Sequence, residues 1–153
     1  MASPSASATL QQMESEGYRQ VGPYGGTGGA AFSDDLTTVA QLIAVTVKSG
    51  GRVDAIQATW RTTDGKQVTG PWHGGEGGNN PRTFVLQEGE FITKVTINSG
   101  AKVDRVQFWT NKGAYFDGGG SGGGGDPHDV SGSVYGFFGR SGAAVDALGF
   151  FVK

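Results

Sequence analysis

The sequence predicts an all-β fold with internal threefold repetition, and three observations support this prediction. Apolar residues recur with period two in segments rich in β-branched and aromatic residues. These segments are separated by glycine-rich turns, with 29 glycines among the 153 residues and no Gly-x-y period. Two kinds of loop motif each occur three times. Many short strands joined by such turns are typical of a sandwich, a barrel or a prism.

Seven segments have the strand pattern, and they are spread along the chain from residue 42 to residue 152. They are Leu42–Val47, Val53–Thr62, Arg82–Gln87, Phe91–Asn98, Val103–Thr110, Ser133–Phe138 and Val145–Val152. The sequence Thr-Asp-Gly-Lys at 63–66 predicts a hairpin turn, because Asp-Gly supplies the positive φ that such turns need. Trp60 and Trp109 lie inside strand patterns, so we expect both in the core.

The two ends of the chain differ in composition. Residues 1–19 are rich in Ser, Ala, Thr and Gln, and we expect a flexible leader, part of which could form a first strand. Residues 20–153 then form a single domain, which is long enough to bury a core without disulfides. Residues 1–13 lack a basic segment followed by an apolar one, which favours a cytoplasmic location, with secretion as the alternative.

Charge and hydropathy exclude several classes of partner. The net charge is −2, from 12 basic and 14 acidic residues, which is a poor electrostatic match for nucleic acid or an anionic membrane. No apolar run approaches the ~20 residues that a membrane-spanning helix requires. We therefore expect neither a nucleic-acid partner nor insertion into a membrane.

The first repeated motif is Ser-Gly-x-x-Val-Asp, at 49–54, 99–104 and 141–146. Its aspartates, Asp54, Asp104 and Asp146, lie 50 and 42 residues apart, and each copy leads into a predicted strand. One isolated aspartate after a glycine turn would most simply bond to its own backbone. Three copies in step with a second motif indicate internal duplication instead. We call these segments the aspartate loops.

The second repeated motif is an aromatic residue followed by a glycine-rich run, at 22–29, 70–78 and 113–123. We call these runs the glycine loops. The third copy is the most degenerate, and 118–125 could be either an ordered segment or a flexible linker. The aromatic residues Tyr24, Trp72 and Tyr115 could line binding sites or pack between strands.

The two motifs together have the chemistry of a sugar site. A carboxylate accepts hydrogen bonds from two hydroxyls at once, and bonds to a charged group are the stronger kind. Adjacent backbone amides can donate to sugar oxygens. Glycine allows the backbone to approach a ligand closely, because it has no Cβ atom. The sequence therefore predicts three similar carbohydrate sites.

Three longer segments resemble the jacalin-related lectin family, and the likeness covers roughly residues 22–153. They are 85–92, 108–115 and 136–149, the last of which closely resembles the C-terminal binding segment of mannose-specific members. The resemblance implies a β-prism I fold, with three four-stranded antiparallel sheets around a pseudo-threefold axis. It also implies binding of mannose or glucose glycans without metal or other cofactor, and association into a homodimer or larger homo-oligomer.

The resemblance assigns one aspartate loop and one glycine loop to each sugar site. The first site has Gly142, Ala144, Val145 and Asp146 facing Gly29, the second has Gly50, Arg52, Val53 and Asp54 facing Gly78, and the third has Gly100, Lys102, Val103 and Asp104 facing Gly123. A three-site member of the family has an aromatic residue two positions before each aspartate, where this chain has Ala144, Arg52 and Lys102. Two sites thus gain a cation. We rank the first site as the surest and the third as the most altered.

Other function classes have weaker support. The chain has only His73 and His128, no cysteine, and no recognisable nucleophile–base set, which argues against an enzyme. Asp117, Asp126 and Asp129 loosely resemble a calcium-binding repeat, but calcium needs about six to eight oxygen ligands. A β-prism module for protein interaction, with partly vestigial sugar sites, is a further alternative. Galactose-type specificity is another, although the unbroken chain through the first glycine loop favours mannose.

Overall fold

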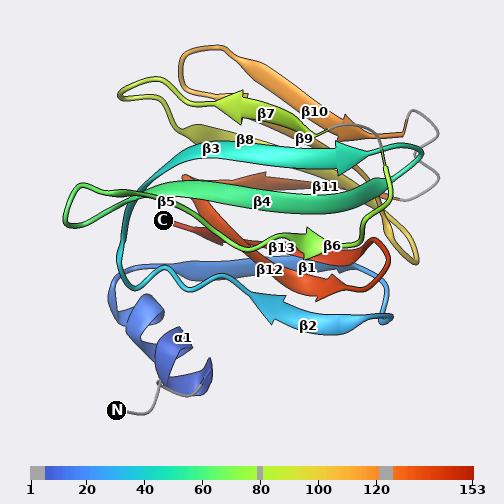
Figure 1. Cartoon of the computed structure of the whole chain (residues 1–153), viewed down its shortest axis with the longest axis horizontal. Coiled ribbons are helices and arrows are strands. Elements are labelled where there is room, and N and C mark those ends of the chain that lie inside the picture. Colours follow the sequence, from blue (N-terminus) through green and yellow to red (C-terminus); the bar gives the residue numbers. More distant parts are fainter. Residues whose placement is uncertain (1–5, 79–80, 121–125) are drawn as a thin grey trace.

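The computed structural model describes residues 6–78, 81–120 and 126–153 of the chain. Nearly all of this part is β structure (Figure 1). The elements are α1 (Ala6–Ser15), β1 (Arg19–Gly25), β2 (Ala30–Ser33), β3 (Val39–Ser49), β4 (Val53–Thr62), β5 (Gln67–Thr69), β6 (His73–Gly74), β7 (Arg82–Val85), β8 (Ile92–Ser99), β9 (Val103–Thr110), β10 (Tyr115–Gly119), β11 (Asp126–Ser131), β12 (Val134–Ser141) and β13 (Val145–Val152). No helix in the described ranges is long and apolar enough to cross a membrane.

The strands form three antiparallel sheets, as the β-prism prediction requires. Their strand orders are β1-β13-β12-β2, β10-β9-β8-β11 and β5-β4-β3-β7, and β6 pairs with β4 along the same edge as β5. Each sheet is built on a central hairpin of two long strands, β3–β4, β8–β9 or β12–β13. The all-β prediction and the arrangement in three four-stranded sheets are confirmed.

The inner strands were predictable from sequence, whereas β7, within the predicted segment Arg82–Gln87, is the one outer strand that was also predicted. The predicted segments Val53–Thr62, Val103–Thr110 and Val145–Val152 coincide with β4, β9 and β13. The missed strands, β1, β2, β5, β6, β10 and β11, all lie at sheet edges. Edge strands bury fewer side chains, so their sequences lack a clear period-two apolar pattern. Their pairing with an inner strand makes them extended.

The core lies between the three sheets and is rich in phenylalanine. Phe137 contacts both Phe108 and Phe150, and none of the three is exposed to solvent. Trp60 is buried as predicted, and its indole N–H donates to the carbonyl of Tyr135 at 2.7 Å. The prediction for Trp109 was wrong, because it lies half-buried on the outer face. Successive side chains of a strand point to opposite faces, and Phe108 takes the inward position.

The leader is more ordered than the sequence suggested, because part of it forms α1. Met13 at the end of this helix is only 1% exposed, and its sulfur accepts the backbone N–H of Leu36 at 3.3 Å. Tyr18 is also buried and meets Tyr135 edge to face. These contacts dock the helix against the first sheet (Figure 1). The expectation of flexibility failed because Met13 finds its partners only in the folded domain.

The turn between β7 and β8 is closed by Glu90, a buried carboxylate. Its oxygens accept the backbone N–H of Gln87 at 2.9 Å and the hydroxyl of Thr110 at 2.6 Å. The hydrogen bond from the Gln87 amide has the largest effect, and together with the one from Thr110 it lowers the pKa of Glu90 below its usual value. This segment is one of the three on which the family resemblance was based.

Candidate functional site

The three aspartate loops are the turns of the three central hairpins, and they share one geometry. The glycine after the serine donates its N–H to the carbonyl two residues later, from Gly50 to Arg52, Gly100 to Lys102 and Gly142 to Ala144, at 2.9–3.0 Å. The serine before each turn pairs with the valine after it. All three turns lie at the right-hand end of the prism in Figure 1. The repeated sequence therefore encodes a repeated turn at one end of the molecule.

Each glycine loop lies beside the aspartate loop that the sequence paired with it. Gly26 donates its N–H to the carbonyl of Asp146, Gly75 to that of Asp54, and Gly120 to that of Asp104, each at 2.9 Å. The first site thus joins the two ends of the domain. Gly123, the predicted donor of the third site, lies outside the described residues.

The carboxylates face positions where only glycine fits. A Cβ atom at Gly29 would lie 2.6 Å from Asp146 Oδ2, and one at Gly78 would lie 2.6 Å from Asp54 Oδ2. Both glycines also have positive φ, +70° and +90°, which other residues rarely adopt. The side chains of Val53, Val103 and Val145 are fully buried, so these valines can offer a ligand only their backbone.

The glycine loops also make a contact that the sequence did not predict. A Cβ atom at Gly26, Gly75 or Gly120 would lie about 2 Å from a carbonyl oxygen of a different site, belonging to Ala101, Ala143 or Gly51 respectively (2.1, 2.0 and 2.1 Å). Each glycine loop therefore packs against the aspartate loop of a neighbouring site. The three sites therefore form a closed ring. The glycine loop of the first site contacts the aspartate loop of the third, that of the third contacts the aspartate loop of the second, and that of the second contacts the aspartate loop of the first.

We expect Gly75→Ala to lower the free energy of unfolding by about 1–3 kcal/mol, because the added methyl group overlaps the carbonyl of Ala143. Gly51→Ala is the matched control, since nothing lies within 4 Å of the Cβ position there. Urea unfolding of both variants measures the difference. Equal stability of the two variants would show that the ring contact does not constrain the fold.

The chain can be placed in a family on sequence grounds once this geometry is known. A family model for the jacalin-like lectin domain matches residues 21–151. This chain belongs to that family. The resemblance seen in the motifs is therefore confirmed, and the β-prism with its loops at one end is the scaffold of a lectin domain.

Known lectins are similar over most of this lectin domain. Horcolin from Hordeum vulgare is 34% identical over 143 residues, which cover 87% of this chain and 95% of horcolin. Griffithsin from Griffithsia sp. is 36% identical over 101 residues, covering 65% of this chain and 69% of griffithsin. Among solved structures, a mannose-binding jacalin-related lectin from Ananas comosus superposes with a TM-score of 0.78 at 28% identity, covering 89% of this chain and 97% of that one.

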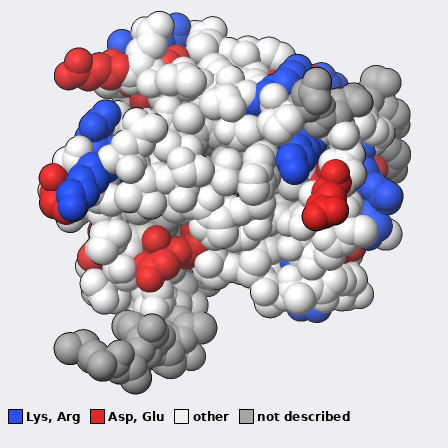
Figure 2. All heavy atoms as spheres, in the orientation of Figure 1, with Lys and Arg blue, Asp and Glu red and all other residues white. Residues whose placement is uncertain are grey.

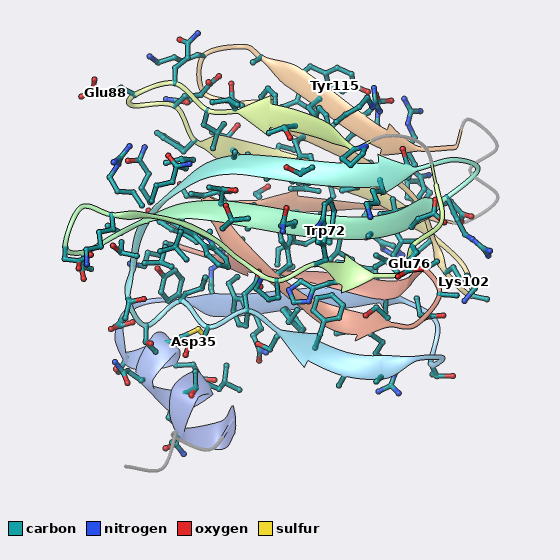
Figure 3. All side chains as sticks on the ribbon, viewed as in Figure 1. Asp35, Trp72, Glu76, Glu88, Lys102 and Tyr115 are labelled. Carbon is teal, nitrogen blue, oxygen red and sulfur yellow. The ribbon has the colours of Figure 1, made fainter. Side chains whose placement is uncertain are left out.

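The three carboxylates of this lectin domain have different surroundings. Asp146 is only 3% exposed, and its Oδ1 accepts a hydrogen bond from the ammonium of Lys102 at 2.5 Å. Asp54 and Asp104 are half-buried. Within the described ranges, neither of these two carboxylates has a side-chain hydrogen bond or ion pair. Lys102 belongs to the aspartate loop of the third site, at the right-hand end of the prism (Figure 3), and its ammonium reaches the carboxylate of the first site.

The second and third sites of the lectin domain border one hollow. This hollow has a volume of about 550 Å³ and is lined by Gly50, Gly51, Arg52, Asp54, Gly78 and Asp104. Acidic and basic side chains lie close together at this end of the molecule (Figure 2). Two of the predicted sites therefore open onto a common space that contains two carboxylates and one guanidinium.

The sequence left open whether the aromatic residues before the glycine loops line the binding sites or pack between strands, and the three residues differ in their surroundings. The ring of Tyr24 stacks on His128 with centroids 4.5 Å apart. Tyr115 packs against Trp109 and accepts a hydrogen bond from Gln107 at 2.7 Å, at the start of β10 rather than at the loop. Trp72 is 38% exposed beneath the ammonium of Lys48. Packing between strands thus accounts for both tyrosines.

The aspartates that suggested calcium have other partners. Asp117 receives two hydrogen bonds from Arg105, at 2.6 and 3.2 Å, and this carboxylate raises the pKa of the guanidinium. Asp129 accepts the hydroxyl of Thr96 at 2.6 Å. The side chain of Asp126 lies outside the described residues. In the part of the chain that the structure describes, no three His, Cys, Asp or Glu residues gather as a metal site would require.

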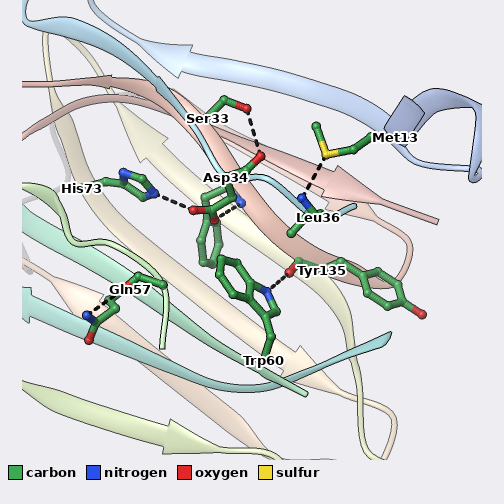
Figure 4. A network of polar contacts seen from close by, with 10 residues as sticks. Met13, Ser33, Asp34, Leu36, Gln57, Trp60, His73 and Tyr135 are labelled. Atoms are coloured by element: carbon green, nitrogen blue, oxygen red, sulfur yellow. Dashed lines mark hydrogen bonds and ion pairs between the residues drawn. The ribbon is translucent and has the colours of Figure 1, made fainter. Parts of the chain in front are cut away.

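His73 has a structural role that the sequence did not reveal. Its Nε2 lies 2.7 Å from Asp34 Oδ1, and its ring stacks on Phe32 with centroids 4.1 Å apart (Figure 4). Asp34 Oδ2 also accepts the backbone N–H of Phe137 at 2.9 Å. His73 immediately precedes Gly74, so this buried contact anchors the glycine loop of the second site to the first sheet.

Proposed function

We propose that this lectin domain binds mannose- or glucose-bearing glycans at up to three sites and acts by binding alone, without catalysis. The observation that carries the proposal is the repeated pairing of an aspartate carboxylate with a glycine loop at one end of the prism. The carboxylate would accept two sugar hydroxyls, and the amides of both loops would donate to sugar oxygens. The mannose-binding relative from Ananas comosus supports this choice of sugar.

The second site has the most accessible arrangement for this chemistry. Asp54 is half-buried beside Gly50 and Gly78, and its carboxylate borders the hollow described above. A sugar entering from that hollow would meet the carboxylate and the bare glycine backbone together. We therefore propose a ranking with the Asp54 site first, whereas the ranking expected from sequence placed the Asp146 site first.

Useful affinity would come from several sites acting together. A shallow polar site of this kind would hold one monosaccharide with a Kd of about 1 mM, or roughly −4 kcal/mol. Linked sites can raise avidity by about 10²–10⁴ if one branched glycan or coated surface spans them. Three sites at one end of the domain fit such a ligand, and we propose that a homodimer or larger homo-oligomer extends the effect.

Calorimetric titration of the purified chain with methyl α-mannoside tests the proposal. We expect millimolar binding that is unchanged after treatment with a chelator, together with much weaker binding of methyl α-galactoside. Loss of binding after chelation would contradict the metal-independent mechanism. Preference for the galactoside would contradict the assigned sugar, and no binding of either sugar would favour an interaction module with vestigial sites.

A further inference from the structure

The carboxylate of the first sugar site is already bonded to a cation from another site. Lys102 Nζ lies 2.5 Å from Asp146 Oδ1, and the aspartate side chain is only 4% exposed. Lys102 itself is two residues before Asp104, in the aspartate loop of the third site. A hydrogen bond between two charged groups is stronger than one between a carboxylate and a neutral hydroxyl.

The ring of loops explains why Lys102 reaches this position. Gly26 in the first glycine loop packs on the carbonyl of Ala101, which places the next residue, Lys102, beside Asp146. The same contact elsewhere in the ring is between Gly75 and Ala143, and the residue that follows Ala143 is Ala144. An alanine carries no charge, so it cannot bond to a carboxylate as Lys102 does.

At the remaining contact of the ring, the corresponding residue is the cation Arg52, but it does not form the ion pair that Lys102 forms. Gly120 packs on the carbonyl of Gly51, which brings Arg52 to the side of Asp104. Arg52 is exposed, and it makes no ion pair within the described ranges. The residue two positions before the aspartate is therefore different in each of the three loops, and among the described residues only Lys102 bonds to the carboxylate of a neighbouring site.

From these contacts, and on the basis of the proposed function, we propose that Lys102 blocks the first sugar site by occupying the carboxylate of Asp146. A sugar hydroxyl must displace the ammonium from Oδ1 before it can bond there. The first site therefore binds sugar more weakly than the second, where no described residue competes for Asp54. Because Lys102 is about one-third exposed, salt screens the pair, and high ionic strength opens the site.

The test isolates the first site and then removes the cation. The double variant Asp54→Ala, Asp104→Ala leaves only the Asp146 carboxylate, and Lys102→Met is added to it, which removes the charge and keeps an unbranched side chain. NMR titration with methyl α-mannoside follows the amides of Gly28, Gly29 and Gly142. We expect the added change to tighten binding about tenfold, which corresponds to about 1.4 kcal/mol.

Lys66→Met in the same double variant is the matched control. It removes the same charge from the exposed hairpin at the opposite end of β4, and we expect it to leave the Kd unchanged. Raising NaCl from about 50 to 500 mM should lower the Kd for methyl α-mannoside in the variant that retains Lys102, because salt screens the ion pair. The Kd of the Lys102→Met variant, which lacks the pair, should not change.

The outcomes separate this inference from the proposed function. Tighter binding by Lys102→Met, with the salt response lost, supports the block. Unchanged or weaker binding overturns it, and weaker binding would make Lys102 a ligand of the sugar. If the parent chain, with all three aspartates, binds no mannoside at all, the proposed function itself fails. If the parent binds but the isolated first site does not bind with or without Lys102, only the block is overturned.

Discussion

Replacing Asp54, Asp104 and Asp146 together by alanine is expected to abolish retention on a mannan column. A hydrogen bond to a charged group contributes about 1.5–3 kcal/mol, which is a large part of the roughly 4 kcal/mol that a millimolar site provides. Each site would lose the carboxylate of its aspartate loop, and the remaining backbone amides of that loop could donate but not accept. Column retention and calorimetry of the triple variant measure the loss directly.

The fold should survive this triple replacement. The loop hydrogen bonds at these positions use backbone atoms, from Gly26, Gly75 and Gly120 to the aspartate carbonyls, and alanine keeps them. Lys102, freed from Asp146, is exposed enough to reach solvent. The matched control replaces Glu16, Asp64 and Glu88, three exposed acidic residues, and should bind like the parent. A folded triple aspartate variant that is retained like the parent would contradict the assignment of the sites.

Asp34→Ala is expected to lower the free energy of unfolding by about 2–5 kcal/mol. The carboxylate is 2% exposed and accepts hydrogen bonds from two buried partners, His73 and the backbone N–H of Phe137. Removing it leaves both without their acceptor, and each unsatisfied buried group costs about 1–3 kcal/mol. Urea unfolding of the variant measures the effect.

The neighbouring residue provides the control for this prediction. Asp35 is exposed, and among the described residues only Thr37 donates to its side chain, so Asp35→Ala should cost about 1 kcal/mol or less. An Asp34→Ala variant as stable as the Asp35→Ala variant would refute the role of the buried contact. Since His73 anchors the loop of the second site, Asp34→Ala should also weaken sugar binding there more than at the first site.

Much of the scaffold and the pairing of the loops could be predicted from sequence. Most residues of β4 and all residues of β13 are buried, and β9 buries alternate side chains from Val106 onward, so the apolar pattern of these inner strands is local in the sequence. The hairpin turn at 63–66 was equally local, with Gly65 at a φ of +86°. The partnership of each aspartate with one glycine loop came from the order of the repeats and from the family resemblance.

Other features depend on residues that meet only in three dimensions. The sequence of β9 does not show which of Phe108 and Trp109 points inward, because both are large and apolar. The burial of Met13 needs the backbone of Leu36, and the role of His73 needs Asp34. In each case the partner is far away in sequence, and no local pattern identifies it.

Neighbouring residues encode the three repeated turns, the three glycine loops and the all-β class, so these features can be predicted from sequence. The differences between the three sites arise from contacts between distant parts of the chain. Closure of the three sheets places Ala101 against Gly26, and with it Lys102 against Asp146. The chemistry of the Asp146 carboxylate therefore depends on a residue from another site, which only the closed ring brings within hydrogen-bonding distance.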